Sequence, residues 1–362
     1  MAKNVFVYNL TPRDAAWHSD IVGPGYFEWW YLDGMFEEGY EIGGLLHAAR
    51  GDTVLGGLLG GTAKTPEEEK WPNVSFRITT PDNQAFELGR SYRPETFKAS
   101  ADTCDVNLGG NTFVGKFRPN GLPEEFRLKV ADGDMGLDLV YKVMVTGVKL
   151  ADRDGGYTYY HPIKKTCYGW YPVSPRSRIE GTITLKGKKI SVHGEGYQDH
   201  QLGNYSTADV MPIEFWGHIY AGDYTMVWTD SFAGENKGYR HFSPFILWKG
   251  NKPILNTYDF MVIPEKWELE PETRMPAPVV ETLRATDGKT SVRIVLPPGK
   301  LIERVRYVGG KRFTEDSPGA YFRWVTDAQV EITRGDEVET VTGMALHEHM
   351  WHTEWFPYRR VK

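Results

Sequence analysis

The sequence is poor in three features that point directly to a function: cysteine, excess basic charge and long apolar runs. Its 362 residues include only Cys104 and Cys167, too few for a disulfide framework or a zinc cluster. Lys and Arg total 42 against 48 Asp and Glu, and the net charge of −6 disfavours nucleic-acid binding. No apolar run approaches the ~20 residues that span a bilayer, and the N-terminus lacks a signal-peptide pattern. We therefore expect a cytoplasmic protein without stable membrane insertion.

Long amphipathic helical patterns are equally scarce, whereas aromatic residues, glycine and proline are plentiful. The 12 Trp, 20 Tyr and 17 Phe suit pleated strands, and the 39 Gly and 22 Pro suit turns. Short strand-like runs bounded by turn residues recur along the chain, for example at residues 74–79, 179–185 and 224–229. The pattern predicts an all-β protein made of two barrel or sandwich domains.

Proline-rich segments indicate where this chain divides. Residues 171–178 interrupt the strand pattern with two prolines, so we predict an N-terminal domain at 1–178 and a C-terminal domain at 179–362. Residues 264–278 contain four prolines and are predicted to form a long loop within the second domain.

The aromatic run around Trp30 contains an acidic residue. Strand alternation places Glu28 and Trp30 on one face and Tyr31 on the other. A carboxylate between indoles is costly to bury unless it is paired or protonated. Glu28 is therefore either a working acid or, as we favour, a structural partner of an arginine such as Arg176 or Arg178.

A second segment, residues 194–204, combines a carboxylate with glycines and a tyrosine. Tyr197 and Asp199 are two residues apart and share a face in a strand, whereas His200 faces the other way unless the glycines introduce a bulge. Asp199 in an aromatic cavity would be a proton donor, because desolvation disfavours its charged form. The alternative is that its carboxylate accepts hydrogen bonds from backbone amides in a turn.

A third segment reads as a hairpin whose turn lies near Gly222. Trp216 and His218 share one face of its first strand and are expected to face a pocket, because a histidine on an apolar strand needs a polar partner. Trp228, on the second strand, is expected to pack in the core.

Near the C-terminus, one histidine-rich run could bind a metal. In a strand His347 and His349 would share a face with Glu348 on the other, and His352 follows closely. No further ligand can be assigned from the sequence, so we favour ordinary polar residues lining a barrel mouth and assign no metal site.

Four motifs of this chain resemble those of one superfamily. They are residues 28–34 (Glu-Trp-Trp-Tyr-Leu-Asp-Gly), 168–170 (Tyr-Gly-Trp), 196–200 (Gly-Tyr-Gln-Asp-His) and 216–218 (Trp-Gly-His). The chain resembles the carotenoid 1,2-hydratase (hydroxyneurosporene synthase) superfamily, which includes AttH-type proteins, and is most similar to its kievitone hydratase and Diels–Alderase branch. The resemblance spans residues 17–350 and implies two lipocalin-like β-barrel domains packed against each other.

The same resemblance implies roles for individual residues. Asp199 matches the aspartate proposed as the acid of the carotenoid hydratases, Tyr197 matches its tyrosine neighbour, and Trp170 matches their tryptophan. Tyr168 replaces a histidine of those enzymes. This exchange argues against carotenoid hydration itself, because a phenol has a much higher pKa than an imidazole.

These features predict a cofactor-independent hydratase, cyclase or isomerase that acts on a hydrophobic, unsaturated terpenoid, polyene or prenylated molecule. We predict Asp199, Tyr197 and His218 as catalytic. The substrate-binding residues are predicted to be Glu28, Trp30, Tyr168, Trp170, His200 and Trp216. Two alternatives remain open, a pericyclase that folds its substrate and a non-catalytic lipocalin-like carrier. We expect a monomer or a weak homodimer.

Overall fold

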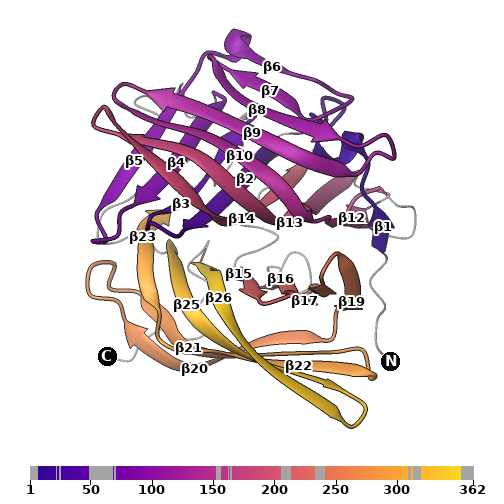
Figure 1. Cartoon of the computed structure of the whole chain (residues 1–362). Coiled ribbons are helices and arrows are strands. Elements are labelled where there is room, and N and C mark those ends of the chain that lie inside the picture. Colours follow the sequence, from indigo (N-terminus) through magenta and orange to yellow (C-terminus); the bar gives the residue numbers. More distant parts are fainter. Residues whose placement is uncertain are drawn as a thin grey trace.

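The strands of this protein form two large, curled antiparallel sheets that lie one above the other (Figure 1). The structure is a computed structural model, and it describes residues 7–21, 23, 26–48, 68, 71–151, 156–161, 163, 165–204, 213–232, 241–308, 311–312 and 319–351. The predicted all-β, lipocalin-like fold class is confirmed. In the described part of the chain, no helix has the length and apolar character needed to cross a bilayer.

The first sheet contains 12 strands, all from the N-terminal side of residue 205. Their order across the sheet is β5 (Ala85–Ser91), β4 (Asn73–Thr79), β3 (Glu41–His47), β2 (Tyr26–Phe36), β14 (Lys188–Asn204), β13 (Thr166–Leu185), β10 (Met135–Val145), β9 (Pro123–Asp132), β8 (Asn111–Phe117), β7 (Asp105–Leu108) and β6 (Phe97–Ala99), with β12 (Tyr159–His161) beside β13. A small sheet pairs β1 (Val7–Asn9) with β11 (Val148–Leu150), and two 3₁₀ turns, η1 (Pro12–Ala15) and η4 (Pro94–Thr96), complete this half.

The second sheet also contains 12 strands. Their order is β19 (Lys252–Thr257), β18 (Phe245–Lys249), β16 (Tyr224–Phe232), β15 (Ile213–Ala221), β26 (Glu337–Trp351), β25 (Gly319–Arg334), β22 (Thr290–Leu296), β21 (Pro276–Thr286) and β20 (Phe260–Leu269), with β17 (His241–Phe242) beside β16, β23 (Lys300–Val308) beside β25, and β24 (Lys311–Arg312) beside β23. The predicted hairpin is confirmed, because β15 and β16 pair across a turn at Gly222.

The prolines that suggested a division of the chain lie inside strands. Residue 178 lies within β13, and the chain passes from the first sheet to the second between Asn204 and Ile213. β13 accommodates Pro172 next to register shifts against β14, and proline is tolerated in a sheet at such irregularities. The loop predicted at residues 264–278 is wrong for the same reason: most of it belongs to β20 and β21, which pair through a bulge at Pro264.

Strand alternation divides the buried apolar residues into three layers. Trp30 and Leu32 of β2 join the core inside the first sheet, and Trp228 joins the core inside the second, as predicted. The opposite face of β2, with Trp29 and Tyr31, joins a third cluster built from both sheets. We call this cluster the interface layer; its buried members are Phe27, Trp29, Tyr31, Leu45, Val145, Val148, Leu150, Tyr168, Trp170, Tyr197, Trp216, Val227, Ile246, Trp248, Ile302, Tyr321, Leu346 and Met350.

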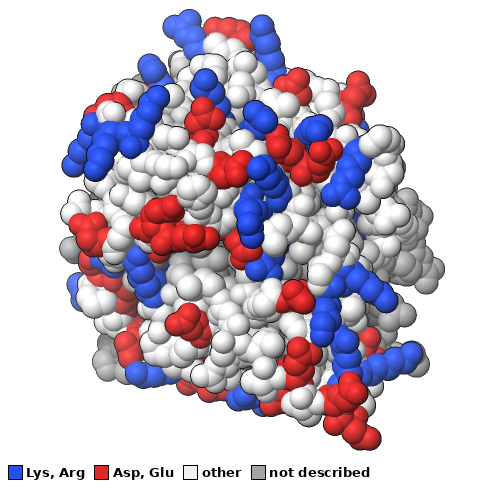
Figure 2. Space-filling view, in the orientation of Figure 1, with Lys and Arg blue, Asp and Glu red and all other residues white. Residues whose placement is uncertain are grey.

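Charged side chains surround this apolar interior. Figure 2 shows basic and acidic residues interspersed over the face in view. Such mixing agrees with the mild net charge of −6.

Candidate functional site

The position of β14 in the first sheet places Asp199 in the interface layer. In the ladder of the first sheet β14 runs between β2 and β13, so Asp199 is paired with Tyr31 on one side and with Pro172 on the other. Tyr197 lies two residues earlier and points the same way, as predicted from alternation. These positions direct both side chains toward the second sheet.

The Asp199 carboxyl group is fully buried and held at one oxygen only. Its Oδ2 accepts hydrogen bonds from the indole Nε1 of Trp170 at 2.8 Å, from the hydroxyl of Tyr197 at 3.0 Å and from the side-chain amide of Gln201 at 3.2 Å. Its Oδ1 has no partner among the residues that the structure describes. The two oxygens of this carboxyl group are therefore in very different surroundings.

Burial raises the pKa of Asp199 from 3.8 to about 8, although the hydrogen bonds from Trp170, Tyr197 and Gln201 act to lower it. The group is thus mostly protonated at neutral pH. Because Oδ2 already accepts three hydrogen bonds, the proton belongs on Oδ1, the oxygen that no donor contacts. The Asp199 side chain is consequently a proton donor through Oδ1.

Tyr168 is linked to the same carboxyl group through Gln201. The Tyr168 hydroxyl donates to Oε1 of Gln201 at 2.9 Å, and the amide nitrogen of Gln201 donates to Asp199. Gln201 was missed by the sequence reasoning. The signal was present, because Gln201 is two residues beyond Asp199 and so shares its face of β14.

The second sheet contributes Trp216 and His218 from neighbouring positions of β15. Their rings share a face, with centroids 5.7 Å apart, and both lie against Tyr197 at 5.1 and 5.4 Å. His218 is fully buried and has the predicted polar partner: its Nε2 lies 2.9 Å from Oδ2 of Asp33 in the first sheet. Since a carboxylate only accepts, Nε2 carries the proton, and in the neutral imidazole Nδ1 is then an acceptor.

Asp33 is a second residue that the sequence reasoning missed. Its Oδ1 accepts from the backbone N–H of Tyr197 at 3.0 Å, and its Oδ2 lies 3.2 Å from the hydroxyl of Tyr31. It therefore fixes the strand that carries Asp199 as well as the imidazole of His218. Alternation along β2 contains a signal for it, because Asp33 shares a face with Tyr31.

An arginine of the second sheet extends this network. Arg323 is fully buried; its Nε donates to Glu348 at 2.8 Å, and its Nη1 lies 3.1 Å from Glu303. Glu348 in turn accepts from the hydroxyl of Tyr31 at 3.2 Å. The contacts from Arg323 to Asp33 therefore form one continuous polar chain across the two sheets. No motif in the sequence pointed to Arg323.

A second buried carboxyl group lies on the same face of β15 as Trp216. Burial raises the pKa of Glu214 from 4.5 to about 7, and the hydroxyl of Thr229 donates to it at 2.8 Å. Glu214 is the natural comparison for Asp199, because both are buried acids that face the seam between the two sheets, where the interface layer lies.

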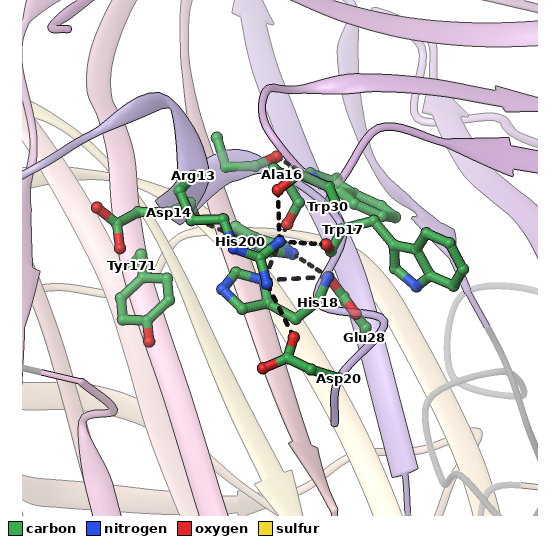
Figure 3. A network of polar contacts seen from close by, with 12 residues as sticks. Arg13, Asp14, Ala16, Trp17, His18, Asp20, Glu28, Trp30, Tyr171 and His200 are labelled. Atoms are coloured by element: carbon green, nitrogen blue, oxygen red, sulfur yellow. Dashed lines mark hydrogen bonds and ion pairs between the residues drawn. The ribbon is translucent and has the colours of Figure 1, made fainter. Parts of the chain in front are cut away.

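Three of the predicted site residues lie elsewhere. Glu28, Trp30 and His200 are on the opposite faces of β2 and β14, inside the first sheet, so the structure does not bring them together with Asp199 (Figure 3). The arginine partner predicted for Glu28 is wrong. Oε1 of Glu28 lies 3.0 Å from Nε2 of His200 and accepts a hydrogen bond from the backbone N–H of His18. Oε2 of Glu28 accepts a hydrogen bond from the hydroxyl of Tyr26.

The Glu28 cluster has a donor set that could hold a metal ion, since His18, Glu28 and His200 offer ligand atoms within 4.8 Å of one another. The geometry favours an ion pair. Nδ1 of His200 donates to the backbone oxygen of Asp14 at 2.8 Å, its Nε2 faces Glu28, and the ring stacks on Trp30. Hydrogen bonds from the two histidines lower the pKa of Glu28 to about 2 against the opposing effect of burial. Both oxygens of its carboxylate are thus already in use.

The histidine run near the C-terminus follows the predicted alternation. His347 and His349 point into the core of the second sheet, against Trp324 and Phe215 respectively, and Glu348 points to the seam. Nδ1 of His347 lies 3.0 Å from Oε2 of Glu281, but within the described residues His347 and His349 belong to no group of three metal-ligating side chains. His352 lies outside the described residues.

Comparisons with known proteins extend the argument from this site to the whole chain. No family model matches the chain, and no curated protein matches it. Solved structures do match. CghA, in a structure with Sch210972, aligns with a TM-score of 0.68 and 11% identity over 98% of this chain and 96% of CghA.

Two further structures align over nearly their full lengths. An AttH-type protein, NE1406 from Nitrosomonas europaea, gives a TM-score of 0.60 at 14% identity over 96% of this chain and 97% of its own. Kievitone hydratase from Nectria haematococca gives 0.56 at 13% identity over 98% of each chain. The fold expected from the four sequence motifs is therefore confirmed: this chain has the fold of AttH-type NE1406, CghA and kievitone hydratase.

Proposed function

We propose that the protein is an enzyme that hydrates, dehydrates or cyclises a hydrophobic, unsaturated small molecule at the seam between its two sheets. The observation that carries this proposal is the Asp199 carboxyl group, which is fully buried, has its pKa raised to about 8 by burial and has no partner at Oδ1 among the described residues. A neutral carboxylic acid in an aromatic environment is a general acid matched to neutral pH. Likeness in fold to a hydratase supports the proposal.

The same seam supplies a base. Nδ1 of His218 is an acceptor, because Nε2 is bound to Asp33, and both His218 and Asp199 border the ring of Tyr197. In a dehydration, Asp199 gives its proton to the departing hydroxyl group as the C–O bond breaks. His218 takes a proton from the adjacent carbon, and that C–H electron pair forms the new double bond. The released water returns the proton from His218 to Asp199, and hydration is the reverse reaction.

Ring closure is the second candidate, and the indole and phenol faces of the interface layer favour it. Trp170, Trp216 and Tyr197 can hold a polyene in a folded conformation and face a developing cation. Here the Asp199 O–H polarises a carbonyl or alkene without necessarily transferring its proton.

The test uses substitutions that keep side-chain volume. Asp199→Asn removes the acid, and Glu214→Gln is the matched control, because it neutralises the other buried acid of the seam. Each protein is incubated in D2O with a panel of terpenoid, polyene and prenylated phenolic compounds, and products are followed by mass spectrometry. We expect Asp199→Asn to lower turnover about 10²–10⁴-fold and Glu214→Gln to leave it within about threefold.

The outcomes separate the alternatives. Gain of water with deuterium on carbon, or loss of water, identifies acid catalysis, whereas an isomeric product without deuterium identifies a pericyclic reaction. Full turnover by Asp199→Asn contradicts the assignment of Asp199 as the acid. Compounds that bind and are recovered unchanged from every protein identify a carrier instead.

A further inference from the structure

Three buried polar atoms around the ring of Tyr197 lack partners among the residues that the structure describes. They are Oδ1 of Asp199, Nε1 of Trp216 and Nδ1 of His218. Buried polar groups are normally hydrogen-bonded, and leaving one unpaired is unfavourable. Three such atoms in one place therefore indicate a site built to contact something beyond the protein's own side chains.

The three residues that carry these atoms all contact Tyr197. The Tyr197 hydroxyl is 3.0 Å from Asp199, and its ring centroid is 5.1 Å from that of Trp216 and 5.4 Å from that of His218. Asp199 comes from β14 of the first sheet, whereas Trp216 and His218 come from β15 of the second. The group therefore exists only when the two sheets are packed together.

Their hydrogen-bonding roles are fixed by chemistry. An indole N–H can only donate, so Trp216 offers a donor. The Asp199 proton sits on Oδ1, since Oδ2 already accepts three hydrogen bonds, so this oxygen also offers a donor. Nδ1 of His218 offers an acceptor, because Nε2 is bound to Asp33. Two donors beside one acceptor complement an oxygen atom with two lone pairs, and a hydroxyl hydrogen where one is present.

We infer that this site selects unsaturated ligands that carry a carbonyl or hydroxyl oxygen, and that Trp216 binds this oxygen through its indole N–H. A hydrocarbon polyene would bury all three groups without partners, whereas an oxygen-bearing ligand satisfies at least two. The inference rests on the proposed function for the location of the site, but it concerns recognition and not turnover. It assigns Trp216 a role as a hydrogen-bond donor in addition to the packing role of its ring.

The experiment compares ligands of equal shape that differ in one atom. β-Ionone, a conjugated ketone, is paired with the hydrocarbon in which a methylene group replaces its carbonyl oxygen, and longer polyene ketones are paired in the same way. Affinities are measured by equilibrium dialysis for the wild type, for Trp216→Phe and for Trp267→Phe. The last is the control, because Trp267 packs against the core of the second sheet, away from the seam. Circular dichroism checks the fold of each variant.

We expect the wild type and Trp267→Phe to bind at least one ketone about tenfold or more tightly than its hydrocarbon partner, and Trp216→Phe to lose most of that preference. The carbonyl infrared band of the bound ketone should lie at lower frequency in the wild type than in Trp216→Phe, because the hydrogen bond weakens the C=O bond. Equal affinity within every pair, or no binding of any ketone, overturns the inference. Turnover by Asp199→Asn does not enter these measurements, so the failure of one proposal is distinguishable from the failure of the other.

Discussion

At the scale of single residues, Asp199 shows how an ordinary carboxyl group becomes a proton donor. Burial raises its pKa to about 8, and three donors on Oδ2 limit that rise. Among the described residues no donor contacts Oδ1, so the neighbours of Asp199 determine both where the proton sits and the direction of its transfer. Tyr197, by contrast, has its pKa raised well above 10 by burial, so its hydroxyl keeps its proton and serves as a hydrogen-bond donor.

Trp170→Phe should shift the titration of Asp199 upward. Of the three hydrogen bonds that stabilise the carboxylate, the one from the Trp170 indole lowers the pKa of Asp199 most. Removing this donor therefore favours the protonated form. Activity that needs the acid should fall in the wild type as pH rises through about 8, and in Trp170→Phe this fall should move to higher pH. The carboxylic-acid infrared band that disappears in Asp199→Asn measures the midpoint directly. An unchanged or lower midpoint in Trp170→Phe, with Trp267→Phe as control, contradicts the prediction.

At the scale of elements, β2 and β14 separate two kinds of chemistry on their two faces. One face presents Asp33 and Asp199 to the seam, while the other buries the Glu28–His200 pair inside the first sheet. Neighbouring residues of one strand therefore take unrelated roles. The pair stabilises the strand that carries the acid without facing the second sheet.

His200→Gln should destabilise the protein by about 3–5 kcal/mol, because it leaves the buried charge of Glu28 without its partner. His193→Gln is the matched control: it removes an exposed histidine from Glu38 in the same strand and should cost less than about 1 kcal/mol. Urea unfolding followed by circular dichroism measures both variants. Similar losses for the two would contradict the assigned ion pair.

The same pair predicts a pH dependence of stability. Because the folded-state pKa of Glu28 is lowered from 4.5 to about 2, its contribution to stability is present above pH 4.5 and is lost as pH falls toward 2. The difference in unfolding free energy between the wild type and Glu28→Gln should therefore shrink over that range.

At the scale of the whole molecule, a glycine and an arginine hold the two sheets together. A Cβ atom on Gly43 of β3 would lie 1.9 Å from Nη1 of Arg323, so the first sheet leaves room there for a side chain of the second. Arg323 cannot move aside easily, because Glu303 and Glu348 hold it in place.

Gly43→Ala should therefore lower stability by about 1–3 kcal/mol, the usual range for overpacking a buried contact. Gly156→Ala is the control, since a Cβ at that position meets no atom of the described residues within 4 Å. Thermal and urea unfolding measure both. A Gly43→Ala protein as stable as Gly156→Ala would show that the sheets pack together without this contact.

The sequence by itself determined the all-β class, the faces of the aromatic strands and the shared direction of Tyr197 and Asp199. These follow from local rules, because side chains alternate along any extended strand. Only the tertiary structure decided that Asp33, Gln201 and Arg323 complete the site and that Glu28 pairs with His200. Those contacts join residues up to hundreds of positions apart, such as Tyr31 and Glu348, and their pairing depends on how two curled sheets meet. Local rules also failed to predict that the prolines of β13 lie within a strand, because a bulge is a property of the strand pair and not of either strand alone.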